Sequence, residues 1–162
     1  MNLEQLKTEI TAKLDSVKTY IDENVPQVVG VEAINEFNEN FEKESFDGKK
    51  WQNVKRRELD SPWYGHSGQT GKKSNSRKTA KILDGETGEL KNATTWRREG
   101  KRVIISNEVP YAKVHNDGLP AKIYGKKLFM MPKRQFIGVT DKLKTTIQNK
   151  VERDITNILK KT

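Results

Sequence analysis

The sequence contains no cysteine among its 162 residues. This absence excludes disulfide scaffolds, thiolate zinc sites, iron–sulfur clusters and cysteine nucleophiles together. Hydrophobic residues make up only 33% of the chain, and no apolar run approaches the roughly 18 residues that a membrane-spanning helix needs. The first residues also lack the basic and apolar pattern of a secretory signal. We therefore expect a soluble intracellular protein, with no membrane partner, whose stability comes from packing.

Histidine is almost as scarce, because it occurs only at His66 and His115. A metal site built on several histidines is therefore excluded, and no glycine-rich phosphate loop is present. Gly65-His66-Ser67-Gly68 lacks the strand–turn–helix context of a serine hydrolase elbow. The acidic segment 84–89 could hold a hard cation, but its glycines fit a turn better. The sequence thus predicts no enzymatic activity, no metal and no cofactor.

Charge is distributed unevenly along the chain, whose net charge is +9. Residues 1–48 carry 4 basic and 11 acidic side chains, residues 49–81 carry 10 and 2, and residues 82–162 carry 17 and 9. An acidic first third before a basic remainder favours contact with a polyanion and complementary contacts between neighbouring copies. Ordinary solubilising charge is the alternative explanation for the scattered lysines.

The N-terminal region has the periodicity of amphipathic helices. One apolar stripe consists of Leu3, Leu6, Ile10, Leu14, Val17 and Ile21, whose spacings of three and four residues predict a helix over residues 1–25. Asn2 can cap this helix, and Gln5 follows three residues later at the spacing of a capping box. Asn24-Val25-Pro26 is expected to end or redirect the chain. A second helix is predicted from residue 26 or 30 to residue 44. The domain prediction is an N-terminal helix at 1–25, followed by one domain at 26–162.

The second half of the chain has the patterns of strands and then of a helix. Two apolar and β-branched runs at residues 90–98 and 101–106 predict a hairpin, and residues 121–131 predict another that turns at Gly125. A short helix is expected at residues 110–116. A long C-terminal helix, capped by Thr140, carries an apolar stripe from Leu143 to Ile158. This order predicts an α+β fold, with an antiparallel sheet, N-terminal helices and a long C-terminal helix.

Between these regions lies a basic arm at residues 65–81, which has almost no apolar residues and is predicted to be mobile. Trp51, Trp63 and Tyr64 are expected to hold its base against the core. The arm's candidate DNA-facing residues are Lys72, Lys73, Arg77, Lys78 and Lys81. They could neutralise phosphates without reading bases, and no aromatic side chain lies among them to stack on single strands. A solvated loop is an equal alternative.

Four short motifs follow one another in order. Residues 48–51 form a Gly-x-x-Trp element, and residues 82–90 contain Ile-Leu followed by Thr-Gly-x-Leu. Residues 111–118 read Tyr-Ala-x-x-His-x-x-Gly after a predicted strand, and residues 132–138 read Pro-x-Arg-x-Phe-x-Gly before the last helix. With these motifs, residues 28–160 resemble the virion morphogenesis or tail completion proteins of tailed bacteriophages, including the Mu-like family and related neck (head–tail connector) proteins.

The resemblance implies a non-enzymatic virion component that is assembled in the host cytoplasm. It further implies a ring of copies, with a hexamer as one candidate size, that contacts other tail or connector proteins and lets genomic DNA pass through its opening. The residues that carry the resemblance are given structural roles: Trp51, Gly88, Leu90, Tyr111, His115, Gly118, Arg134, Phe136 and Gly138. The N-terminal helix looks like an addition to the family pattern.

Two other functions remain open at this point. The basic arm also suits a free nucleic-acid-binding protein of a mobile element. A nuclease that uses His115 with nearby carboxylates is the third and weakest hypothesis, because further histidines are missing.

Overall fold

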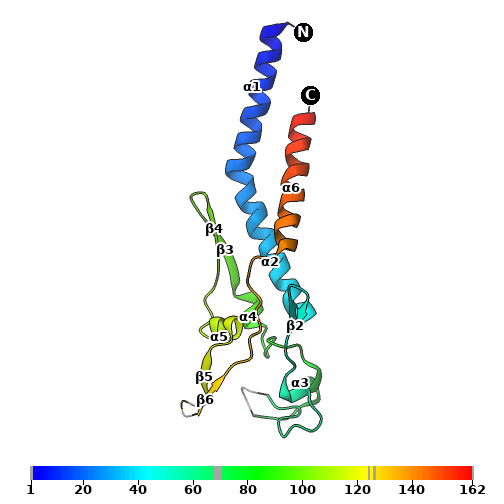
Figure 1. Cartoon of the computed structure of the whole chain (residues 1–162), viewed down its shortest axis with the longest axis vertical. Coiled ribbons are helices and arrows are strands. Elements are labelled where there is room, and N and C mark those ends of the chain that lie inside the picture. The colour runs from blue at the N-terminus through cyan, green and yellow to red at the C-terminus, as the bar shows by residue number, and fades with distance from the viewer. Residues whose placement is uncertain (1, 68–70, 124, 126, 162) are drawn as a thin grey trace. The chain divides into compact units, whose positions relative to one another are not determined.

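The structure, a computed structural model, describes residues 2–67, 71–123, 125 and 127–161. The chain forms two compact units. Unit 1 contains the described residues of 1–36, 95–106 and 139–162, and unit 2 contains those of 37–94 and 107–138. Helices and short strand pairs make up both units (Figure 1), which confirms the predicted α+β class.

Unit 1 begins with helix α1 (Leu3–Thr19). Its first turn has the reciprocal capping box that the sequence predicts: the Asn2 side chain accepts from the Gln5 N–H at 2.8 Å, and the Gln5 side chain accepts from the Asn2 N–H at 2.9 Å. The two bonds satisfy backbone donors that have no partner within the helix. They specify where α1 begins.

The prediction that residues 24–26 end the first helix is wrong. A π-helical turn (Tyr20–Asn24) follows α1 directly and leads into helix α2 (Val25–Lys43). At the junction, the Val25 N–H donates to the Tyr20 carbonyl five residues earlier. Pro26 cannot donate to a carbonyl four residues earlier, and its ring would crowd that carbonyl. The wider π turn accommodates the proline without stopping the helix.

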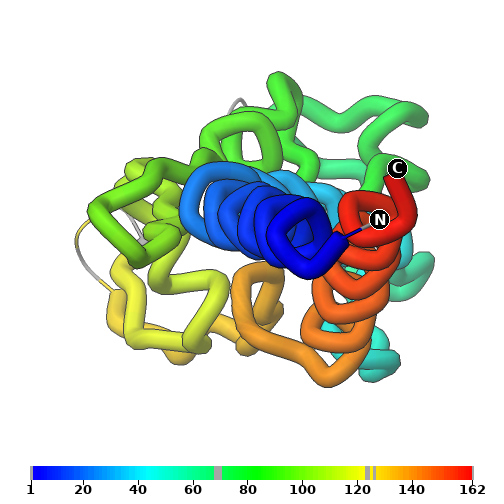
Figure 2. Tube along the Cα trace, turned by 90° about the horizontal axis from the view of Figure 1, so that it is seen from above, coloured from blue at the N-terminus to red at the C-terminus, as the bar shows by residue number. Residues whose placement is uncertain are grey.

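Helix α6 (Asp141–Lys160) confirms the predicted C-terminal helix and its cap, since the Thr140 hydroxyl accepts from the Leu143 N–H at 3.0 Å. Helices α1 and α6 contact each other and run antiparallel, side by side in both views (Figures 1 and 2). Tyr20 Oη donates to an Asp154 carboxylate oxygen at 2.9 Å. This bond, with an ion pair between Lys150 and Glu32, ties α6 to the first helices of unit 1.

The predicted first hairpin is present but begins later than expected. Residues Glu89–Asn92 form the short helix α4, and the strands are β3 (Thr94–Glu99) and β4 (Arg102–Asn107). Leu90 is buried on α4. An apolar residue within a run of polar ones cannot by itself distinguish a strand from one helical turn.

The Trp96 ring of β3 lies directly over Gly30 of α2, where a Cβ atom would come within 2.2 Å of the indole. Replacing Gly30 with alanine is therefore expected to lower the free energy of unfolding by about 1–2 kcal/mol, because overpacking outweighs the better helix propensity of alanine. Chemical denaturation measures the change. Val31→Ala, at an exposed position of the same helix, is the control and should change stability by less than about 0.5 kcal/mol. An unchanged or more stable Gly30→Ala variant would contradict the close contact.

Unit 2 contains the end of α2 and a series of short elements. These are β1 (Ser45–Phe46), β2 (Lys49–Lys50), a 3₁₀ turn (Lys55–Arg57), α3 (Asn75–Thr79), α4, α5 (Ala112–Asp117), β5 (Pro120–Ile123) and β6 (Lys127–Met130). Strands β1 and β2 pair antiparallel, as do β5 and β6, with Ala121 opposite Phe129. Across the described residues the strands make three separate two-stranded sheets rather than the one sheet expected.

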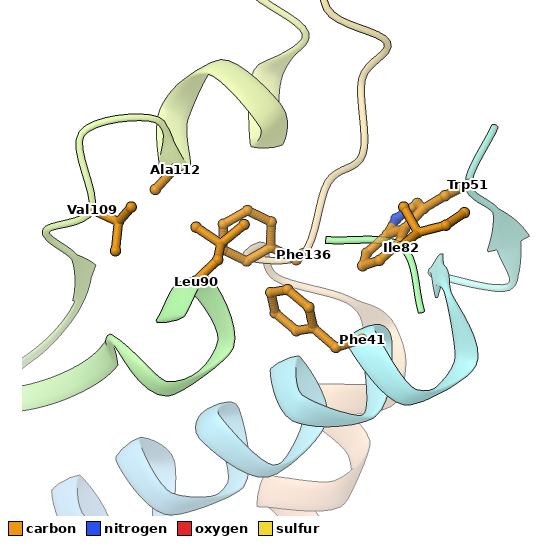
Figure 3. Close-up of a cluster of buried hydrophobic side chains, with 7 residues drawn as sticks. All are labelled: Phe41, Trp51, Ile82, Leu90, Val109, Ala112 and Phe136. Carbon is orange, nitrogen blue, oxygen red and sulfur yellow. The ribbon is translucent and has the colours of Figure 1, made fainter. Parts of the chain in front are cut away.

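The hydrophobic core of unit 2 gathers side chains from segments far apart in the sequence (Figure 3). Its centre is Phe136, which is fully buried and whose ring lies 5.0 Å from that of Phe41. The other members are Trp51, Ile82, Leu90, Val109 and Ala112. Because few residues of unit 2 lie in long helices or strands, this cluster supplies much of what holds its loops in place.

The extended segment around Phe136 is held by side chains instead of a strand partner. Asn116 Oδ1 accepts from the backbone N–H groups of Phe136 and Ile137, both at 3.0 Å. The buried Asn40 donates to the Phe136 carbonyl at 3.1 Å, and Trp51 Nε1 donates to the Gln135 carbonyl at 2.8 Å. These bonds satisfy backbone groups that burial would otherwise leave unpaired.

Candidate functional site

A cavity of about 440 Å³ lies within unit 2. Its lining comes from the chain on both sides of α3, from the turn before α4, and from α5 and the segment after β6. The lining residues are Val54, Arg56, Trp63, His66, Ser67, Gly71, Arg77, Ile82, Leu83, Asp84, Gly85, Thr87, Glu89, Leu90, Tyr111, His115 and Arg134. The cavity thus combines apolar walls with three arginines and two histidines.

The two arginines of the neighbouring 3₁₀ turn have different hydrogen-bond partners. Arg57 makes a bidentate pair with the Glu44 carboxylate at 2.6 and 2.8 Å, which lowers the pKa of Glu44 and raises that of Arg57. Arg56 instead donates through Nη2 to the backbone carbonyls of Ala80 and Lys81, at 2.7 and 2.8 Å. Burial, followed by the charges of nearby arginines, lowers the pKa of Arg56 to about 10. Arg56 therefore lies among positive charges that the nearby Glu44 carboxylate only partly offsets.

The other two cavity arginines also donate to backbone oxygens. Arg77 Nη1 donates to the Gly85 carbonyl at 2.6 Å. Arg134, which is only 5% exposed, donates to the carbonyls of Gln52 and Asn53 at 3.1 and 3.3 Å. Burial lowers the pKa of Arg134. A carbonyl dipole neutralises a guanidinium less completely than a carboxylate does.

His115 lies half-buried on α5, with the Tyr111 ring at 6.0 Å. Its pKa is lowered by burial and then by the positive charge of Arg134, so the neutral imidazole is favoured. Tyr111 Oη donates to the Glu89 carboxylate at 2.5 Å, and that bond and burial raise the pKa of Tyr111 to about 12. Nδ1 of His115 is buried and has no hydrogen-bond partner among the residues described.

Three side-chain nitrogens in the described part of the chain are buried without a hydrogen-bond partner: Arg56 Nε, Arg77 Nε and His115 Nδ1. All three residues line this one cavity. An unpaired buried donor is costly, so clusters of them are uncommon in folded proteins. Because all three residues line the same cavity, it is the strongest candidate site on unit 2.

The five candidate DNA-facing residues lie in different surroundings in the structure. Lys72 and Lys73 are exposed, Lys78 Nζ lies 4.8 Å from the Tyr64 ring centre, and Lys81 pairs with the Glu42 carboxylate. Arg77 belongs to the cavity. The arm also contains α3 and an isolated β-bridge between His66 and Lys73; residues 68–70 lie outside the described residues. The role of these side chains toward DNA stays a prediction.

The three aromatic residues at the base of the arm differ in how deeply they are buried. Trp51 is buried in the core as expected, and Tyr64 is half-buried beneath Lys78. Trp63 is 58% exposed, so the prediction that it packs on the core is wrong. Its ring lies 5.5 Å from that of His66 instead.

The residues that carry the family resemblance fall into three groups. Trp51, Leu90 and Phe136 belong to the core, while Tyr111, His115 and Arg134 line the cavity. The third group is the glycines Gly88, Gly118 and Gly138. Gly118 ends α5 in the left-handed conformation (φ 71°), where a Cβ would come within 2.8 Å of Lys133. Gly88 precedes α4, and Gly138 lies against Phe46.

Sequence reasoning missed the polar side of this site. Arg56 and Arg57 were counted among the basic residues that precede the arm, and Glu44 was given only as the end of the second helix. Two adjacent arginines after Trp51 are the only signal in the sequence. No group of three acidic or histidine side chains placed to hold a metal ion occurs in the described ranges. Of the helices that the structure describes, none is long and apolar enough to cross a bilayer.

Comparison with protein families gives a match that extends over nearly the whole chain. The model of the phage virion morphogenesis family matches residues 1–156. The chain belongs to this family. The resemblance seen in the four motifs is thereby confirmed, and the match includes the N-terminal helix, which had looked like an addition. No curated protein and no solved structure matches the chain.

Membership of the phage virion morphogenesis family gives the chain a role in building the phage particle. It is a family of structural assembly proteins.

Proposed function

We propose that this chain is a non-enzymatic tail completion or neck (head–tail connector) protein of the virion. In this role, copies of the chain form a closed ring around the path of the DNA. The observation that carries the proposal is the apolar stripe of α1, which the chain itself leaves uncovered.

Helix α1 has no buried residue over its 17 residues. The exposed fractions of its stripe side chains are 79% for Leu3, 40% for Leu6, 51% for Ile10 and 61% for Leu14. A continuous row of exposed apolar side chains at helical spacing is typical of an interface rather than of a free surface. Packing of the stripe against another copy would remove it from water.

Charge supports a second copy as the occupant, in a head-to-tail arrangement. Residues 1–48 have a net charge of −7, whereas each of the two following segments, 49–81 and 82–162, has +8. Like faces would repel each other, but the acidic region of one copy attracts the basic region of the next. A head-to-tail contact uses two different surfaces and closes into a ring when its rotation permits.

The basic residues of the arm suit the same role. Lys72 and Lys73 are exposed, and lysines attract phosphates through charge without reading bases. A ring opening lined in this way would tolerate any DNA sequence that passes.

Sedimentation velocity at increasing protein concentration, together with negative-stain images, tests ring formation. The double variant Ile10→Gln/Leu14→Gln is expected to remain monomeric at concentrations where the natural protein forms rings. Its far-UV spectrum should stay the same, because both side chains are exposed. Leu59→Gln/Leu128→Gln, at 76% and 63% exposed positions outside α1, is the matched control and should still assemble. A natural protein that stays monomeric, even with tail tube or connector proteins present, would refute the ring.

The runner-up is a free nucleic-acid-binding protein, which the exposed Lys72 and Lys73 favour. A gel shift near physiological salt separates the two functions. The ring proposal expects weak binding by the monomer. Tight, salt-sensitive binding by monomers that is lost in Lys72→Gln/Lys73→Gln would favour the runner-up.

A further inference from the structure

We propose that the cavity of unit 2 binds a carboxylate carried on an apolar peptide segment of a partner protein. The argument rests on the shape and lining of the cavity and on its arginines, which have no carboxylate partner within the part of the chain that the structure describes. It does not depend on ring formation, so the two proposals can fail separately.

The cavity has the size and walls of a site for a small ligand or a few side chains. Its volume is about 440 Å³, within the range of about 300–1,000 Å³ that is usual for such sites. Apolar lining comes from Val54, Ile82, Leu83 and Leu90. Walls of this kind bind the apolar part of a ligand by removing it from water.

The polar part of the lining consists mainly of donors. Arg56 Nε and Arg77 Nε each carry one N–H that is buried and unpaired, and no guanidinium nitrogen can act as an acceptor. His115 Nδ1 is the third unpaired atom and completes the donor set when it carries the imidazole proton. A carboxylate accepts several hydrogen bonds at once, and its bonds to arginine are among the strongest in proteins. The three atoms are closed to solvent in this structure, so a carboxylate reaches them only when the Arg56 and Arg77 side chains turn toward it.

Charge in and around the cavity favours an anion. Arg56, Arg77 and Arg134 have no carboxylate within ion-pairing distance among the described residues, because Glu44 is taken by Arg57. The lining carboxylates, Asp84 and Glu89, are exposed, and Glu89 accepts from Tyr111. The lining thus carries three arginines against two carboxylates, and its charge is net positive.

A peptide carboxylate fits better than a phosphate of DNA. A duplex cannot enter a cavity of this volume, and the apolar walls offer nothing to a charged sugar–phosphate chain. The exposed lysines that suit phosphates, Lys72 and Lys73, do not line the cavity. The carboxylate could be the C-terminus of a partner or an aspartate or glutamate beside apolar residues.

Titration of the natural protein with short peptides tests the proposal. The probes are acetyl-leucyl-phenylalanine with a free carboxylate, its C-terminal amide, and acetyl-leucyl-glutamyl-phenylalanine amide. Inorganic phosphate and a 12-nucleotide single strand serve as competing anions. The readout is the ¹⁵N–¹H signal of the arginine Nε groups, which reports on Arg56 and Arg77 directly.

We expect the free carboxylate to bind at least about tenfold more tightly than the amide, the difference that one charged hydrogen bond provides. Both arginine Nε signals should shift as it binds. The peptide with an internal glutamate distinguishes the source: equal binding indicates a side-chain carboxylate, and weaker binding indicates a C-terminus. Equal affinity for acid and amide, or tighter binding of phosphate or the oligonucleotide with the same shifts, would overturn the proposal.

Matched variants locate the site. Arg77→Gln should weaken binding of the carboxylate probe about tenfold or more. Lys73→Gln removes the same charge from the same segment but lies outside the cavity, so it should retain nearly full affinity. Equal losses in both variants would mean that binding depends only on general charge. If Arg77→Gln unfolds, the shifts of the natural protein decide the question alone.

Discussion

Replacing Phe136 with alanine is expected to lower the free energy of unfolding by about 3–5 kcal/mol, the usual cost of removing a buried aromatic ring. Phe136 has no solvent exposure and packs against Phe41 at the centre of the core of unit 2 (Figure 3). Its neighbours cannot collapse easily into the space, because hydrogen bonds to Asn116 and Asn40 hold the backbone on both sides. Urea unfolding followed by tryptophan fluorescence measures the loss.

Two further variants calibrate this result. Phe136→Leu keeps most of the volume and should cost clearly less, about 1–2 kcal/mol. Leu128→Ala, at a 63% exposed position, should change stability by less than about 0.5 kcal/mol. If Phe136→Ala costs no more than Leu128→Ala, the central position of Phe136 is incorrect.

Replacing Glu44 with glutamine is expected to cost about 2–3 kcal/mol of stability, because it leaves the partly buried Arg57 without a charged partner. The Glu44 carboxylate accepts two bonds from Arg57 and one from the Ile82 N–H at 2.7 Å. It is also the carboxylate whose charge offsets Arg56. Glu9→Gln on α1 is the control. Glu9 makes a solvent-accessible salt bridge to Lys13, so the control should cost less than about 0.5 kcal/mol.

The same residue predicts a pH dependence. Hydrogen bonds from Arg57 hold the pKa of Glu44 below its ordinary value of 4.5. A carboxyl whose pKa is lower in the folded state stabilises the fold above pH 4.5 and loses that contribution as the pH falls through the folded value. The stability of the natural protein should therefore decrease below pH 4.5, and the Glu44→Gln variant should show a smaller decrease. Parallel pH profiles for the two proteins would argue against a stabilising role for this pair.

The local patterns of the sequence predicted several elements correctly. The stripe from Leu143 to Ile158 and the cap at Thr140 specify α6, because helical spacing and a capping hydroxyl act over a few residues. The same holds for the capping box of α1, for α5 with its end at Gly118, and for the turn at Gly125 between β5 and β6.

Errors arose where a local signal has two structural solutions. Pro26 ends most helices, but a π turn lets this one continue. Leu90 fits a strand or a helical turn, and its burial in the core favours α4. Trp63 is large and apolar yet 58% exposed. The chain around it forms turns, and Trp63 lines the cavity instead of entering the core.

The sequence by itself determined the α+β class, the main helices and, through the order of four motifs, the phage virion morphogenesis family. Only the tertiary structure decided which apolar stripe stays uncovered, since the periodicities of α1 and α6 look alike while only α6 has a residue buried on it, Leu143. It also decided that Arg56, Arg77 and His115 meet in one cavity with unpaired nitrogens. Such convergence joins residues up to 59 positions apart, and no local pattern in the sequence records it, because burial and pairing depend on the packing of the whole unit.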